Sequence, residues 1–373
     1  MSKIEEIIKE KCPDGVPYIS LIDLCGTITT GRLNANAMVE NGEYPFYTCD
    51  ATPFRIDTYA FDEEAILISG NGSQVGHINY YKGKFNAYQR TYVLYDFKEV
   101  EVKYLLHYLS GYLRDYIMIH SKKGSVPYIT LPMLQNFKVP VPPTEVQGEI
   151  VNILDTFEEH IECLKKELVL REKSYETIMH SLLRKSNFKK FDNLENYCNF
   201  EKGKTPIQKN TPGSYPLVAT TEHLQTSDNY QFDCEAVCLP LISARGHGVA
   251  SITRIYYQSG KFALGNILCA IIPKDNQIKA EFLRNYLFYH KDTLLVPLMR
   301  GGANVSLTVD SLKKVQIPIP SIEEQQSIIE KLRVFQEILS KEKGLPAEIE
   351  KRQQQYEYYR DKLLSFKEVE VYE

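Results

Sequence analysis

The chain contains one pattern twice, at an interval of 178 residues, and this duplication constrains the fold more than any other feature. A proline-alternating segment, Val139-Pro140-Val141-Pro142, returns as Ile317-Pro318-Ile319-Pro320. After each segment the same residue types recur at the same spacing, as Glu145, Gln147, Ile150, Leu154 and Phe157 in the first copy and Glu323, Gln325, Ile328, Leu332 and Phe335 in the second. Solenoid repeats run about 20 to 50 residues, so a period this long predicts two copies of a whole domain.

The match continues upstream, where the interval shortens by a few residues, as insertions in loops would make it do. Tyr44-Pro45-Phe46 matches Tyr215-Pro216-Leu217. In the same alignment Ser69 and Val75 correspond to Ser243 and Val249. The second copy therefore follows the first through the whole domain.

The composition is that of a globular protein of two domains. A length of 373 residues accommodates two to three domains, and the duplication selects two. The chain is 43% hydrophobic and 25% charged, and it has no signal peptide and no apolar run near 18 residues. We expect a cytoplasmic protein without membrane contact. Its eight cysteines form no CxxC pair, which favours reduced core thiols over a zinc site.

The formal net charge of −4 argues against a nucleic-acid partner, because phosphate contacts need clustered Lys and Arg. The charge is segregated, however. Acidic residues concentrate in the helical stretches, whereas the segments 82–90, 121–124 and 202–209 are locally basic. Basic partner subunits can also share the contact with DNA. The charge balance therefore leaves a role in DNA binding open.

A long amphipathic helix follows each copy. Apolar residues recur at steps of three or four over 144–186, which predicts a helix of about 60 Å at a rise of 1.5 Å per residue. The same stripe returns from Ile322 to about Phe366. There Gly344-Leu345-Pro346 predicts a kink or short break, because proline removes a helical hydrogen bond. Neither helix can bury its apolar stripe alone, so we expect the two to pack as an antiparallel coiled coil that acts as a spacer.

The segments before the helices, about 12–142 and 188–320, have mixed character. Each contains short β-type runs bounded by Gly, Asn and Pro, and each contains one helical patch, at 102–116 and 280–295. This pattern predicts an α+β fold in which helices are appended to a sheet. A short amphipathic piece, 4–11, precedes the first domain, just as the end of the first long helix precedes the second domain. We expect this piece to complete the far end of the second long helix.

The sequence offers no catalytic constellation. Gly203-Lys204-Thr205 lacks the first glycine of a P-loop and is followed by Pro206, and no nucleophile elbow or zinc-protease motif is present. Asp96, Glu101 and Lys103 follow the loose order of a nuclease site, but a chain this charged produces such triples by chance. We therefore expect a chain that is not an enzyme, with the nuclease as an alternative.

These features resemble, over essentially the whole chain, the specificity subunit of Type I restriction-modification enzymes. The resemblance rests on their order and repetition and on local motifs: Cys12-Pro13-Asp14-Gly15-Val16, Gly203-Lys204-Thr205-Pro206 and Ile242-Ser243-Ala244-Arg245-Gly246. The first domain departs from the pattern, with Gly31-Arg32-Leu33 in place of Gly-Lys-Thr-Pro and Ser69-Gly70-Asn71-Gly72 in place of Ser-Ala-Arg-Gly.

The resemblance implies two tandem target-recognition domains of similar fold, each followed by a long helix and each reading one half of a split DNA sequence. The expected boundaries are 1–142 for the first domain with its N-terminal helical piece, 143–187 for the first spacer helix, 188–320 for the second domain and 321–373 for the second spacer helix. A stiff spacer makes the second half-site contact intramolecular, which converts two weak readings into one tight one.

The resemblance also implies partners. They are double-stranded DNA, two methyltransferase (modification) subunits docked on the helices and domains, and restriction subunits that act as endonuclease and translocase. S-adenosylmethionine, ATP and magnesium would serve those subunits, so we expect no cofactor and no metal in this chain.

Base readout needs forked or paired donors and acceptors, such as Arg for guanine and Asn or Gln for adenine. For each candidate, a solvated loop charge or a turn-capping side chain is the alternative interpretation. The candidates are Lys202, Lys204, Arg245, His247, Arg300 and Asn304 in the second domain, and Arg32, Asn71, Gln74, Lys84, Gln89, Arg90, Lys122 and Lys123 in the first.

A second hypothesis, from a different class, is a non-enzymatic protein-interaction scaffold whose coiled coil sets the oligomeric state. Salt separates the two hypotheses. Binding to DNA weakens steeply as the salt concentration rises, whereas binding to a protein partner would be largely insensitive to it.

Overall fold

The computed structural model describes residues 3–120, 127–221, 225–245 and 248–369. The chain divides into two compact units, of which the first comprises residues 1–165 and 348–373 and the second comprises 166–347. Each unit takes part of each long helical stretch, so the boundaries between the units fall inside the helices.

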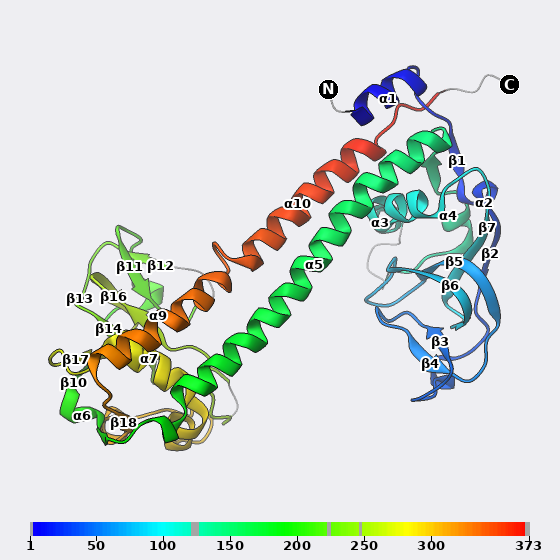
Figure 1. Cartoon of the computed structure of the whole chain (residues 1–373). Coiled ribbons are helices and arrows are strands. Elements are labelled where there is room, and N and C mark those ends of the chain that lie inside the picture. The colour runs from blue at the N-terminus through cyan, green and yellow to red at the C-terminus, as the bar shows by residue number, and fades with distance from the viewer. Residues whose placement is uncertain (1–2, 121–126, 222–224, 246–247, 370–373) are drawn as a thin grey trace. The chain divides into compact units, whose positions relative to one another are not determined.

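The first unit is built on a six-stranded sheet with the strand order β2-β7-β5-β6-β3-β4, in which β3 and β6 run parallel and the other neighbours run antiparallel (Figure 1). A separate two-stranded ribbon pairs β1 with β8. The elements before the first long helix are α1 (Lys3–Lys11), β1 (Tyr18–Ser20), α2 (Leu21–Leu24), β2 (Cys25–Thr30), β3 (Tyr44–Tyr47), β4 (Phe54–Ile56), β5 (Phe61–Ser69), β6 (Ile78–Ala87), β7 (Thr91–Phe97), α3 (Val102–His120), α4 (Leu131–Gln135) and β8 (Lys138–Pro140).

The second unit repeats this topology with its sheet split in two. The strand orders are β10-β17-β14-β15 and β12-β11-β16-β13, so β15 and β16 together take the place of β6, and β11 pairs parallel with β16 as β3 does with β6. The elements are β9 (Phe191–Asn193), α6 (Leu194–Tyr197), β10 (Cys198–Lys202), β11 (Tyr215–Val218), β12 (Gln225–Ser227), β13 (Phe232–Asp233), β14 (Ala236–Pro240), β15 (Tyr256–Gln258), β16 (Lys261–Leu264), β17 (Leu268–Pro273), α7 (Ala280–Tyr289), a π-helical turn (Lys291–Leu295), α8 (Val309–Lys313) and β18 (Gln316–Pro318).

The central strands are continuous apolar runs because both of their faces are covered. On β5, Ile66 and Ile68 belong to the core that contains α3, whereas Ala65 and Leu67 belong to a second cluster with Phe85. Strand β14 alternates in the same way between the core that contains α7 and a cluster around two phenylalanines. A strand buried on both faces lacks the alternation of polar and apolar residues that marks a half-exposed strand.

The duplication extends to individual hydrogen bonds. The fully buried Gln147 side chain accepts from the backbone N–H of Glu101 at 2.7 Å and donates to two backbone carbonyls at 3.2 and 2.8 Å. The fully buried Gln325 side chain accepts from the backbone N–H of Lys279 at 2.8 Å and donates to two backbone carbonyls at 2.9 and 3.0 Å. Each glutamine fastens the start of a long helix to the segment that precedes the domain helix α3 or α7.

The strand register corrects one detail of the predicted alignment. Ser69 pairs with Thr91 across β5 and β7, and Pro240 pairs with Leu268 across β14 and β17. Thr91 and Leu268 are equivalent, since the carbonyl of each accepts a hydrogen bond from the glycine that follows the neighbouring strand. The counterpart of Ser69 is therefore Pro240, and its alignment with Ser243 was wrong, because two matched residues near a loop do not fix a register.

Helix α5 (Thr144–Leu183) spans 40 residues and agrees with the predicted helix over 144–186. In the first unit, Phe157 of α5 stacks on Tyr359 with the ring centroids 5.4 Å apart. In the second unit, Tyr175 of α5 stacks on Phe335 at 6.1 Å. Residue numbers rise along α5 and fall along its partners, so the pairing is antiparallel, as predicted. Within the described part of the chain, none of the helices is long and apolar enough to cross a membrane.

The second long helix is broken where the sequence predicted. It consists of α9 (Ile322–Ile338) and α10 (Leu345–Leu364), separated by residues 339–344. Pro346 lies in the first turn of α10, where a missing N–H costs no helical hydrogen bond. The predicted extent of 321–373 was too long, because α10 ends at Leu364 and the chain continues as a segment in which Glu368 bridges to Val16.

The N-terminal piece closes the first unit as expected. Helix α1 forms an ion pair with α5 through Lys3 and Glu149, at 3.4 Å, and another with α10 through Glu5 and Lys362. The buried Ile4 packs into the same core. Helix α1 therefore completes the end of α10, as expected for the N-terminal piece.

All eight cysteines are free thiols. Five are buried, and burial raises the pKa of the Cys25 and Cys198 thiols to about 12. The expectation of core thiols was wrong for Cys163, which lies exposed on α5.

Candidate nucleic-acid interface

In each unit, four loop segments are joined by backbone hydrogen bonds into one continuous edge beyond the strand ends, which we term the loop edge. The corresponding bonds match: the N–H of Gly70 donates to the carbonyl of Arg90 at 2.9 Å, and the N–H of Leu241 donates to that of Ile267 at 2.9 Å. Loops held in this way present their side chains on a rigid scaffold. The loop edge comprises 31–33, 70–71, 88–91 and 128–129 in the first unit, and 203–205, 241–242, 265–268 and 306–307 in the second.

The structure brings four of the residues predicted in the first domain together on its loop edge. The Gln89 amide donates to the side-chain oxygen of Asn34 at 2.8 Å, and the Asn71 side-chain oxygen accepts from the Cys49 thiol at 3.1 Å. Both amides are thus oriented by neighbouring side chains, and the two arginine side chains are exposed. The four residues are Arg32, Asn71, Gln89 and Arg90.

The other candidates of the first domain lie elsewhere. Gln74 is exposed in the loop between β5 and β6. Lys84 lies on β6, where its ammonium sits 4.7 Å from the centroid of the Tyr59 ring. Lys122 and Lys123 fall outside the described residues.

Arg32 takes the structural place of Lys204, although the motifs around them differ. Gly31 and Gly203 precede these residues, and a Cβ atom on either glycine would lie 1.8 or 2.1 Å from a backbone carbonyl oxygen. Only glycine permits so close an approach of two backbones. The departure of the first copy from Gly-Lys-Thr-Pro therefore leaves the backbone of the loop edge unchanged and alters the side chains that it displays.

In the second unit, the exposed Lys204 lies on the loop edge, whereas the exposed Lys202 ends strand β10. The Arg300 guanidinium donates to the carbonyls of Pro297 and Met299, at 2.5 and 2.9 Å, which matches the turn-capping alternative.

The loops that carry Arg245 and Asn304 in the second unit lie side by side. The N–H of Ser243 donates to the carbonyl of Val305 at 2.9 Å. This bond places the segment of the exposed Arg245 next to that of the exposed Asn304. His247 lies outside the described residues.

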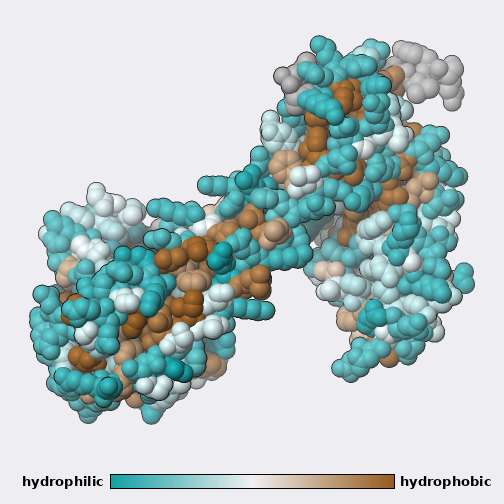
Figure 2. Space-filling view, viewed as in Figure 1, coloured by the Kyte–Doolittle hydropathy of each residue, from teal (hydrophilic) through white to brown (hydrophobic). Residues whose placement is uncertain are grey.

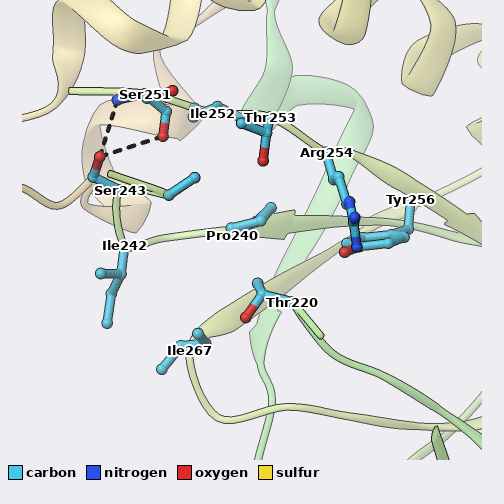
Figure 3. Close-up of a pocket in the computed structure, with 11 residues that line it drawn as sticks. Thr220, Pro240, Ile242, Ser243, Ser251, Ile252, Thr253, Arg254, Tyr256 and Ile267 are labelled. Carbon is cyan, nitrogen blue, oxygen red and sulfur yellow. Dashed lines mark hydrogen bonds between the residues drawn. The ribbon is translucent and has the colours of Figure 1, made fainter. Parts of the chain in front are cut away.

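A cavity of about 440 Å³ opens beside the loop edge of the second unit (Figure 3). Its lining includes Thr220 after β11, Pro240 at the end of β14, and Arg254 and Tyr256 around the start of β15. Arg254 was not among the predicted residues. No local pattern in the sequence marks it, because the residues that line the cavity come from four separate segments.

A polar network ties α3 to both long helices in the first unit. His107 is 2% exposed; its Nε2 lies 2.9 Å from Asp155, and its Nδ1 lies 3.1 Å from the hydroxyl of Tyr356, which donates to Glu158 at 2.8 Å. Burial opposes the ionisation of Asp155, but hydrogen bonds from Lys103 and His107 hold the pKa of Asp155 below its usual value.

The imidazole and the two carboxylates of this network can be compared with a metal-binding site. Among the described residues, His107, Asp155 and Glu158 are the one group whose ligand atoms lie close enough to share a metal ion, within 4.8 Å of one another. Hydrogen bonds already occupy both ring nitrogens of His107, so the network accounts for the arrangement without a metal.

The alternative nuclease residues have structural contacts. The ammonium of Lys103 pairs with Asp155 on α5, and the backbone N–H of Glu101 donates to Gln147. Asp96 lies on β7 with a φ of 60°, next to Gly26. This geometry supports a role for Lys103 in fastening α3 to α5.

Comparison with known proteins identifies the family. Residues 13–170 and 186–351 each match the model described as the Type I restriction modification DNA specificity domain. The chain is 37% identical to the Type I restriction enzyme EcoDI specificity subunit of Escherichia coli, over 38% of this chain and 31% of that protein. It is 29% identical to a putative type I restriction enzyme specificity subunit of Haemophilus influenzae, over 87% of this chain and 89% of that protein.

Solved structures share the fold. The S subunit of a Type I restriction-modification system from M. genitalium superposes with a TM-score of 0.66 at 16% identity, covering 94% of this chain and 97% of that one. A chain from a structure of complex assembly and conformational transition in the type I R-M system gives 0.54 at 16% identity, covering 95% and 98%. The predicted fold class is thus confirmed. Because the family model matches both copies, the chain belongs to the specificity subunits of Type I restriction-modification systems and carries two tandem target-recognition domains.

Proposed function

We propose that this chain reads double-stranded DNA for a Type I restriction-modification complex, that each unit contacts one half of a bipartite target, and that the chain has no catalytic activity of its own. The observation that carries the proposal is the pair of loop edges, which share their backbone hydrogen bonds and differ in their side chains. Two loop edges with the same backbone geometry are suited to making the same kind of contact with DNA twice. Different side chains on them suit two different base sequences.

The side chains on the loop edges support the proposal. The first edge displays the forked donors of Arg32 and Arg90 and the amides of Asn71 and Gln89, which are the groups that read guanine and adenine in the major groove. The amide of Gln89 is held by Asn34, so part of the entropy cost of orienting it is met before DNA binds. The formal net charge of −4 suggests that basic partner subunits supply many of the phosphate contacts.

We further propose that two modification subunits dock on the long helices and the adjacent domains, and that restriction subunits join them. Figure 2 shows hydrophobic residues gathered in patches along these helices on the face in view. Leu170 on α5 is 63% exposed and Val334 on α9 is 56% exposed, which is more than the helix pairing requires. S-adenosylmethionine, ATP and magnesium would act in those partner subunits and not in this chain.

Sequencing of methylated adenines in cells with and without this gene tests the proposal. We expect one bipartite motif with a fixed spacer to lose its methylation when the gene is deleted. An unchanged methylation map in cells that express the modification subunits would contradict the proposal and favour the protein-interaction scaffold.

A further inference from the structure

Among the described residues that line the cavity beside the second loop edge, Arg254 carries the one positive charge. The described lining residues contribute the guanidinium of Arg254 and hydroxyls that include those of Thr220 and Tyr256, and they contribute no carboxylate. Nη1 of Arg254 donates to the carbonyl of Thr221 at 2.8 Å, which sets the orientation of the guanidinium. The hydroxyl of Tyr256 is buried and has no hydrogen-bond partner among the described residues. Oriented donors without a competing anion suit a ligand that presents hydrogen-bond acceptors.

Part of the cavity lining is apolar. Ile242, Ile267 and Pro240 line it, and Ile242 is 44% exposed (Figure 3). Apolar side chains contact base edges such as the methyl group of thymine, whereas a phosphate gains nothing from them. The combination of a guanidinium and an apolar wall therefore favours a base edge over the sugar-phosphate backbone.

The first unit carries different side chains at the same places. By strand register, His77 occupies the place of Arg254, because Asn79 and Tyr256 take equivalent positions opposite β5 and β14. The bond from Gly70 to Arg90 matches the bond from Leu241 to Ile267, so the charged Arg90 stands where the second unit has an isoleucine. Two domains that recognise different base sequences need different side chains at equivalent backbone positions, as these two units have.

We propose that Arg254 reads a guanine in the half-site contacted by the second unit, with Ile242 and Ile267 packed against the neighbouring base edge. The inference rests on the proposed DNA-reading function. A guanidinium matches the O6 and N7 acceptors of guanine in the major groove with two parallel donors, and Lys cannot supply that fork. Arg254 donates through Nη1 to one carbonyl of another segment, whereas Arg300 donates through Nη1 to two carbonyls of its own loop.

The test compares Arg254→Ala and Arg254→Lys with Lys189→Ala, which removes an exposed positive charge from the same unit outside the loop edge. Each variant is expressed as the full chain with its modification subunits, and the intact complex is purified. The probe is a library of double-stranded oligonucleotides that carry the bipartite motif found by methylated-adenine sequencing, with every position changed in turn. Thermal unfolding of each chain verifies that it is folded.

We expect both Arg254 variants to lose about 5-fold to 150-fold of the preference for guanine at one position of one half-site, with the other half-site and Lys189→Ala unchanged. A uniform loss across all sequences, with full rescue by Lys and a smaller dependence on salt, would overturn the proposal in favour of a phosphate contact. An unchanged preference at every position would also overturn it, while the proposed function would stand. If the wild-type chain directs no bipartite motif, the proposed function itself fails.

Discussion

Replacing Gln147 with alanine removes three hydrogen bonds at once, because this fully buried side chain accepts one backbone N–H and donates to two backbone carbonyls. A neutral hydrogen bond contributes about 1 kcal/mol net, so we expect a loss of about 3 kcal/mol in the free energy of unfolding. For a unit of this size that loss lowers the melting temperature by about 6 to 12 °C. Gln325→Ala should have an equal effect, since Gln325 makes the same three bonds.

Differential scanning calorimetry and urea unfolding of the full chain measure both effects. Gln353→Ala is the matched control, because Gln353 is only half-buried on α10 and donates a single hydrogen bond, to the side chain of Glu357 at 3.2 Å. A loss below about 1 kcal/mol for both buried glutamines would show that water replaces their bonds, and the reasoning would then be wrong. A large loss for one glutamine alone would show that the two copies differ in energy despite their equal geometry.

Three further outcomes are expected. Folding lowers the pKa of Asp155 below its usual value near 3.8, so the ionised Asp155 stabilises the fold fully above pH 3.8, and this stabilisation is lost as the pH falls through the lowered pKa. Asp155→Asn should therefore weaken the fall of the unfolding free energy with decreasing pH in a urea-unfolding series. An unchanged pH dependence would contradict this. Tyr104→Phe should cost about 1 kcal/mol in urea unfolding because its hydroxyl donates to the Pro140 carbonyl at 2.9 Å, whereas Tyr286→Phe should cost nothing because its buried hydroxyl has no partner among the described residues; equal losses would refute the comparison. Arg245→Ala should lose about 1 to 3 kcal/mol of discrimination at one base position in competition binding, and a uniform loss would make it a phosphate contact.

The features that the sequence predicted correctly are those that appear as a regular spacing of residues along the chain. The 178-residue interval required two similar domains, and steps of three or four required the long helices. Even the break before α10 was predictable, because Pro346 is tolerated in the first turn of a helix and not in its interior. The two buried glutamines, Gln147 and Gln325, are also separated by the same interval of 178 residues.

The residues that sequence reasoning missed depend on contacts between distant segments. Arg254 meets Thr220 and Ile267 at one cavity because strands of different hairpins are neighbours in the sheets, and no local pattern encodes that arrangement. The alignment of Ser69 with Ser243 failed because loops of different length tolerate many alignments, while hydrogen bonds between strands permit one.

Exchange of residues 188–320 for the corresponding domain of a relative with a different target tests the central claim most directly. The donor domain should carry glutamate at the place of Glu281, which pairs with Arg333 of α9 at 2.5 Å. Sequencing of methylated adenines then reports the target of the chimera. The account predicts that one half of the bipartite motif changes, while the other half keeps its sequence. A change in both halves, or in neither, would contradict the claim that each unit reads its own half.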